Sequence, residues 1–75
     1  MWTPISDCGK QLTVHSRIME KNDAFIKLYE IVEVEFDQYK LKLIEKNNSP
    51  ATEKARPVLS CSQLKKYAFE VEQKG

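Results

Sequence analysis

The sequence predicts an all-β domain, a small barrel of about five strands that spans residues 1–75 as a single domain. Charged and apolar residues alternate through residues 30–46, EIVEVEFDQYKLKLIEK. Residues 11–19 alternate in the same way, and residues 57–61 form a short apolar segment that begins with proline. Because successive side chains of a strand point to opposite faces, this alternation is typical of strands with one buried face.

In residues 25–44 the apolar residues fit the period of a helix and that of a strand about equally, so the charged residues decide between the two. They favour a hairpin. On a helix, Glu33 and Asp37 would repel each other at i,i+4, and no opposite pair has that spacing. A hairpin that turns at Asp37-Gln38 instead places opposite charges across from each other. The pairs predicted by this register are Glu35 with Lys40, Glu33 with Lys42, Val34 with Leu41, and Val32 with Leu43. The period of two places one apolar face on each strand: Ile26, Leu28, Val32, Val34 and Phe36 on the first, and Tyr39, Leu41 and Leu43 on the second.

Two more strands come before and after this hairpin. Residues 11–19 are predicted as a strand whose shared face holds Leu12, Val14, Ser16 and Ile18. Residues 57–61 are predicted as a strand that starts at Pro57. Glu30 interrupts the alternation of the hairpin, which predicts a bulge near residues 29–31. Residues 47–56, NNSPATEKAR, combine turn formers with charge and are predicted to form an exposed loop.

The segment from Ser60 to the end allows two interpretations. A short C-terminal helix would begin with a capping box of Ser60 and Gln63 and would expose Phe69. A 3₁₀ turn over residues 63–67, followed by a strand, would place Tyr67, Phe69 and Val71 on one side. We favour the turn and strand because they bury Phe69, and Leu64 is expected to point inward. With this closing strand, the order of elements is that of an SH3-like barrel.

Two motifs carry a resemblance to a known family. Residues 39–43, YKLKL, and residues 57–67, PVLSCSQLKKY, are separated by a loop. This arrangement resembles the SH3-like C-terminal segment of gypsy-type retroelement integrases, although that family usually has a proline where this chain has Ile44-Glu45-Lys46. The resemblance implies an SH3-like barrel and an accessory contact with nucleic acid or chromatin, not a catalytic core.

Composition limits the location and the redox state that we expect. The chain has no apolar run approaching the ~18 residues of a membrane span, so no membrane partner is predicted. Its first residues, MWTPISDCGK, do not have the pattern of a signal peptide. We therefore expect an intracellular protein, cytoplasmic or nuclear, in which Cys8 and Cys61 are reduced thiols. Cys61 is expected to be an inert cysteine of the core.

No constellation of residues predicts an enzyme, and no cofactor is expected. His15 is the only histidine, and we expect it on the surface. A metal site would need His15, Cys8, Cys61 and a fourth ligand, and the spacing of a known metal motif is missing. Residues 62–65 match SxxK, but the partner motifs of serine acylases are absent. We predict no catalytic residue and no metal ligand.

The charge distribution suggests a binding surface. Residues 30–37 contain four acids and no base, whereas residues 38–66 contain seven bases and two acids. The hairpin offsets part of this contrast, and a solvated surface is the alternative explanation for the rest. The predicted partner-binding residues are Lys54, Arg56, Lys65, Lys66 and Tyr67. The leading hypothesis is a non-catalytic binding module that engages a protein partner or docks in a larger assembly, and the alternative is a nucleic-acid contact module.

Overall fold

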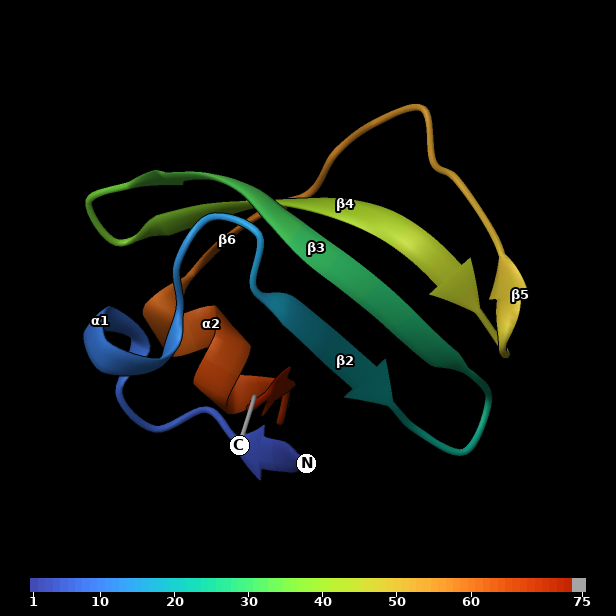
Figure 1. Ribbon diagram of the computed structural model, residues 1–75, viewed down its shortest axis with the longest axis horizontal. Helices are drawn as coiled ribbons and strands as arrows, with labels where there is room; N and C mark the ends of the chain where they lie inside the picture. The colour runs from blue at the N-terminus through green and yellow to red at the C-terminus, as the bar shows by residue number, and fades with distance from the viewer. Residues whose placement is uncertain (74–75) are drawn as a thin grey trace.

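The computed structural model of the chain describes residues 1–73, which form seven strands and two short helices (Figure 1). The strands are β1 (Trp2–Pro4), β2 (Arg17–Lys21), β3 (Ile26–Glu35), β4 (Gln38–Lys46), β5 (Ser49–Pro50), β6 (Val58–Ser60) and β7 (Glu70–Glu72). The helices are α1 (Cys8–Gln11) and α2 (Cys61–Lys66). The all-β prediction is confirmed.

One antiparallel sheet contains all the described strands. Its order is β1-β7-β2-β3-β4-β5, and β6 also pairs with β4. Within residues 1–73 the hydrogen-bonded order therefore ends at β1 and β5 and does not close into a barrel. The strands β2, β3 and β4 curve across the molecule, and both helices lie near the turn of the β3–β4 hairpin (Figure 1).

The core lies between the curved sheet and the helices. Its buried side chains come from most elements: Ile5, Cys8, Leu12, Ile18, Tyr29, Ile31, Tyr39, Leu41, Leu43, Leu64, Phe69 and Val71. The alternation predicted for β4 is confirmed, because Tyr39, Leu41 and Leu43 are all buried. Twelve such side chains in a domain of this size make each large core residue important for stability.

The β3–β4 hairpin is confirmed, but its predicted register is wrong. The two residues between the strands are Phe36 and Asp37, so the turn lies one residue earlier than predicted. The structure pairs Glu35 with Gln38, Val34 with Tyr39, Glu33 with Lys40, Ile31 with Leu41, and Glu30 with Lys42. Opposite charges still face each other across the hairpin, so the charge rule holds although the partners differ.

Bulges explain which residues of β3 are buried. The register shifts between Ile31 and Glu33, and again between Leu28 and Tyr29, close to the predicted residues 29–31. The first shift leaves Val32 outside the pairing, so Tyr29 and Ile31 face the core in place of the expected Val32 and Val34. An extra residue in one strand reverses the phase of every side chain beyond it.

The strand predicted over residues 11–19 begins only at Arg17. Of the predicted segment, Gln11 belongs to α1, where the Asp7 carboxylate accepts from the backbone N–H of Lys10 at 3.3 Å. Residues 12–16 contain a turn, in which the Ser16 hydroxyl accepts from the backbone N–H of Thr13 at 3.0 Å. The side chain of Gln11 also accepts from the backbone N–H groups of Ser6 and Asp7, at 2.7 and 2.8 Å. Side chains that bond to nearby backbone compete with strand pairing, which alternation alone cannot reveal.

His15 lies on the surface, as predicted, in the turn before β2. Its φ is 78°, and its Nδ1 lies 3.1 Å from Oε2 of Glu30 on β3. This hydrogen bond lowers the pKa of Glu30. Because His15 is highly exposed, the contact is a surface feature that adds little to stability.

Both C-terminal interpretations contain part of the observed structure. The capping box of Ser60 and Gln63 is present, and it begins the α-helix α2 where a 3₁₀ turn was favoured. The chain then reverses at Ala68, with φ 55°, and continues as the predicted closing strand. Phe69 and Val71 are buried as expected. Tyr67 is half exposed and does not share their buried face.

The predicted loop over residues 47–56 contains a second hairpin. Asn47 and Asn48 both have positive φ, and Lys46 pairs with Ser49 of β5 across them. Asparagine tolerates this left-handed backbone better than most residues, which explains the two-residue turn. The remainder of the segment is exposed, as expected, apart from the half-buried Ala51.

The cysteines are joined in a disulfide, so the prediction of two reduced thiols is wrong. Cys8 begins α1 and Cys61 begins α2, and 53 positions separate them in the sequence. Cys8 is buried and belongs to the core. The fold brings the first turns of the two helices together, and their distance along the chain gave no indication of this contact.

Candidate partner-binding cleft

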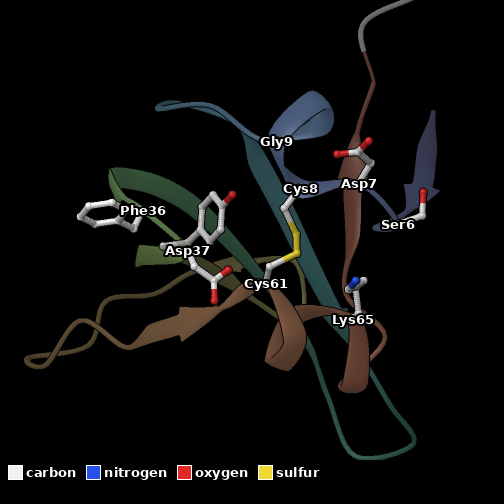
Figure 2. A pocket seen from close by; sticks show the side chains of 9 residues that line it. Ser6, Asp7, Cys8, Gly9, Phe36, Asp37, Cys61 and Lys65 are labelled. Atoms are coloured by element: carbon white, nitrogen blue, oxygen red, sulfur yellow. A yellow bond between two sulfur atoms is a disulfide. The ribbon is translucent and has the colours of Figure 1, made fainter.

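An open cleft of about 590 Å³ lies where the turn of the β3–β4 hairpin approaches α1 and α2. We call it the disulfide cleft. It is lined by Ser6, Asp7, Cys8, Gly9, Phe36, Asp37, Tyr39, Cys61 and Lys65. Figure 2 shows the Cys8–Cys61 disulfide in the middle, with Phe36 and Asp37 to one side and Asp7 and Lys65 to the other. The cleft therefore combines residues that are far apart in the sequence.

Phe36 is the most unusual residue of the disulfide cleft. Its side chain is 98% exposed, and its φ is 51°. A left-handed backbone is unfavourable for a bulky residue, and an aromatic ring gains nothing from full exposure to water. Figure 2 shows the ring at the outer side of the hairpin, pointing away from the disulfide. Phe36 thus occupies its position in spite of two local costs.

Tyr39 is a buried residue of the cleft that carries a polar hydroxyl group. Only 4% of the residue is exposed, and its hydroxyl takes part in none of the side-chain hydrogen bonds within residues 1–73. In the described part of the chain, every fully buried side-chain oxygen or nitrogen has a hydrogen-bond partner. The Tyr39 hydroxyl is therefore accessible from the cleft. Burial raises the pKa of Tyr39, and the negative charges of Asp37 and Asp7 raise it further.

Two carboxylates and one ammonium group set the charge of the cleft. Asp7 comes from the N-cap of α1, Asp37 from the hairpin turn, and Lys65 from α2. Among the described residues, none of the three forms an ion pair. The carbonyl oxygen of Asp37 accepts a hydrogen bond from the backbone N–H of Cys61 at 3.1 Å. This bond holds the backbone of Asp37 next to the first residue of α2, so the position of the Asp37 side chain relative to the helix is constrained.

The structure does not gather the predicted binding residues around one cavity. Lys65 lines the disulfide cleft, whereas Tyr67 lines a second groove. The Nζ of Lys66 lies 5.8 Å from the ring centre of Tyr67, so these two side chains do form a pair. Lys54 and Arg56 are exposed in the segment between β5 and β6. All five residues lie on the surface, as a binding role requires.

Of the residues that line the cleft, sequence reasoning assigned a binding role only to Lys65, and it missed Asp7, Phe36, Asp37 and Tyr39 among the others. It assigned Phe36 to the inward face of β3, because a phenylalanine next to alternating valines resembles a core residue. A turn placed at Phe36-Asp37 would have exposed the ring. The aspartate that follows Phe36 is a turn former, and it was the available indication of that position.

The second groove has a volume of about 230 Å³ and is mostly apolar. Its lining residues are Glu20, Tyr29, Leu41, Pro57, Leu59, Tyr67 and Phe69. Tyr29 is buried there, and its ring centre lies 6.1 Å from that of Phe69. Burial raises the pKa of Tyr29 to about 12, with further contributions from the charges of Glu20 and Glu53. Core residues such as Tyr29 and Phe69 thus line a groove at the surface beside Tyr67.

We expect Tyr29 to make the domain sensitive to alkali. An unfolded tyrosine ionises near pH 10.0, whereas folded Tyr29 keeps its proton until about 12. The stability that follows from this difference is complete below the unfolded pKa and is lost as pH rises through the folded value. The thermal midpoint should fall in this window, and Tyr29→Phe should reduce the fall. An equal fall in the wild type and the variant would contradict the assignment.

Comparison with protein-family models, curated proteins and solved structures finds no match to this chain. The resemblance to the integrase segment therefore stays a prediction. Within residues 1–73, no group of three or more His, Cys, Asp or Glu side chains is arranged to hold a metal ion. In the same residues, neither helix is long and apolar enough to cross a membrane.

Proposed function

We propose that this domain is a non-catalytic binding module that engages a protein partner at the disulfide cleft, with Phe36 as the anchor. The single observation that carries the proposal is the exposed, left-handed Phe36 at the turn of the hairpin. Aromatic side chains that enter a partner's pocket contribute a large share of binding free energy in protein interfaces. The cleft beside Phe36 offers a concave surface to the rest of such a partner.

The cost of Phe36 to the free domain supports this function. A left-handed backbone costs a residue with a side chain about 1–2 kcal/mol, which glycine or asparagine would largely avoid. Burying a phenylalanine side chain is worth about 1.5–3 kcal/mol, and free Phe36 gains almost none of it. A partner that covers the ring would supply that gain. A two-residue hairpin turn itself requires a positive φ, but glycine or asparagine would meet that requirement at lower cost. The presence of an exposed phenylalanine at this position is therefore consistent with a role in recognition.

The variant Phe36→Asn separates binding from folding. Asparagine accepts the left-handed backbone, so the thermal midpoint should be equal to or above that of the wild type. Partner capture should fall by about tenfold or more, as expected when an anchor worth at least 1.4 kcal/mol is removed. Both forms would serve as bait in nuclease-treated extract of the source cells, and captured proteins would be quantified by mass spectrometry.

Val14→Ser is the matched control for this experiment. Val14 is also an exposed apolar residue, but it is not part of the disulfide cleft. Proteins that require Phe36 should be captured normally by this variant. Equal capture of the same proteins by wild type and Phe36→Asn would refute the proposed anchor.

A nucleic-acid contact is the second candidate function. Lys66 and Tyr67 are paired and exposed, and a ring beside a cation suits contacts with bases and phosphates. The integrase resemblance of residues 57–67 points the same way. In that case Lys65→Glu with Lys66→Glu should weaken binding to single-stranded DNA or RNA and flatten its salt dependence, without lowering the thermal midpoint. Binding that is unchanged in the double variant would rule this candidate out.

A further inference from the structure

The disulfide cleft has the chemistry of a site for a cation. Its two carboxylates, Asp7 and Asp37, outnumber the single ammonium group of Lys65. The negative charges of both carboxylates affect the Tyr39 hydroxyl, because each raises the pKa of that phenol. The hydroxyl oxygen of Tyr39 can accept a hydrogen bond, and within residues 1–73 it receives none. A bound cation would thus find an accessible acceptor in a region of negative potential.

The charge next to the cleft continues along the hairpin. Glu35 precedes Phe36 and pairs across the strands with Gln38, a neutral residue. Its charge is therefore not offset by its partner, in contrast to that of Glu33, which faces Lys40. The exposed ring of Phe36 lies between Glu35 and Asp37 in the sequence, and it can pack against the aliphatic stem of a long side chain or face its charge.

We infer that the disulfide cleft binds a lysine or arginine side chain from an extended basic segment of the partner protein. This inference rests on the proposed function and adds the chemical class of the partner. The cation donates hydrogen bonds to the Tyr39 hydroxyl and the Asp37 carboxylate, while Asp7 adds long-range attraction. The stem of the side chain packs against Phe36. A free inorganic cation would leave the exposed ring uncovered, so a peptide segment matches the site better.

Lys65 gives this inference a distinctive consequence. Its ammonium group lies in the same cleft and repels a bound cation. Removing it with Lys65→Ala should strengthen the binding of a basic segment. A nucleic-acid site that uses Lys65 predicts the opposite change, because a phosphate contact would be lost. The direction of the change therefore distinguishes the two classes of partner.

The test measures fluorescence anisotropy with a labelled serine–arginine repeat peptide and a serine–glutamate peptide of the same length. The wild type should bind the arginine peptide, and added salt should weaken the complex. Asp37→Asn should reduce the affinity by about three- to tenfold, the range expected when a charge-assisted hydrogen bond becomes neutral. Asp7→Asn should reduce it less, and asparagine keeps the N-cap of α1.

Asp23→Asn is the matched control, because Asp23 belongs to the connection between β2 and β3. That connection lies at the opposite end of β3 from the β3–β4 turn (Figure 1). This variant should leave the affinity unchanged, and thermal unfolding would verify that every variant is folded. Equal binding of both peptides, no binding of the arginine peptide, or equal effects of Asp37→Asn and Asp23→Asn would each overturn the inference. Any of these results, with partner capture still lost in Phe36→Asn, would leave the proposed protein-binding function standing.

Discussion

Leu64→Ala is expected to remove about 2–5 kcal/mol from the free energy of unfolding. Leu64 is 0% exposed and is the buried residue of α2, where it packs into the core under the sheet. Truncating a buried leucine costs about 2–5 kcal/mol, because the cavity it leaves closes only partly. A domain of this length has a free energy of unfolding of only about 4–11 kcal/mol. The variant thus loses a large part of its stability.

Chemical denaturation followed by circular dichroism would measure the loss. Lys66→Ala is the appropriate control, because Lys66 is exposed in the same short helix and alanine is a good helix former. It should change the free energy of unfolding by no more than about 0.5 kcal/mol. Similar stability losses in both variants would contradict the burial of Leu64 as the cause of the effect.

Removing the disulfide is expected to cost the folded domain about 3–4 kcal/mol. The bond joins residues 53 positions apart and so restricts most of the unfolded chain. The loss of chain entropy on closing a loop of this length corresponds to about 4 kcal/mol at room temperature. Cys8→Ala with Cys61→Ala should shift the denaturation midpoint accordingly, and so should adding dithiothreitol to the wild type.

The double alanine variant also provides an internal control. Its stability should not respond to dithiothreitol, since it has no disulfide to reduce. A wild-type midpoint that is the same with and without reductant would contradict a stabilising disulfide. Because both cysteines line the cleft, this bond also holds the residues around Asp7 near those around Lys65. We therefore expect stability and the shape of the cleft to depend on the same bond.

The sequence predicted those elements whose pattern is local. Alternation along β4 identified Tyr39, Leu41 and Leu43 as core residues, and the capping box of Ser60 and Gln63 marked the start of α2. A strand of period two and a helix start each depend on residues only a few positions apart. Patterns between residues so close in the chain can be recognised in a single sequence.

Local pattern failed where two signals were mixed. Residues 11–19 alternate, but Gln11 belongs to α1 and a hydrogen-bonded turn in residues 12–16 delays the strand to Arg17. The turn at Phe36-Asp37 was placed one residue late because phenylalanine is rarely found with a left-handed backbone. In both cases the alternation of apolar and polar residues correctly identified the neighbouring strand residues. It failed only where local hydrogen bonds or a left-handed backbone took the chain out of the strand conformation.

The sequence by itself determined the all-β class, the β3–β4 hairpin with its opposed charges, the closing strand, and the burial of Leu64 and Phe69. Only the tertiary structure decided the strand register, the Cys8–Cys61 bond and the disulfide cleft. The physical reason is distance along the chain. Bulges shift the register according to how the whole sheet packs, and the cleft joins residues from α1, the hairpin turn and α2, which become neighbours only when the core forms.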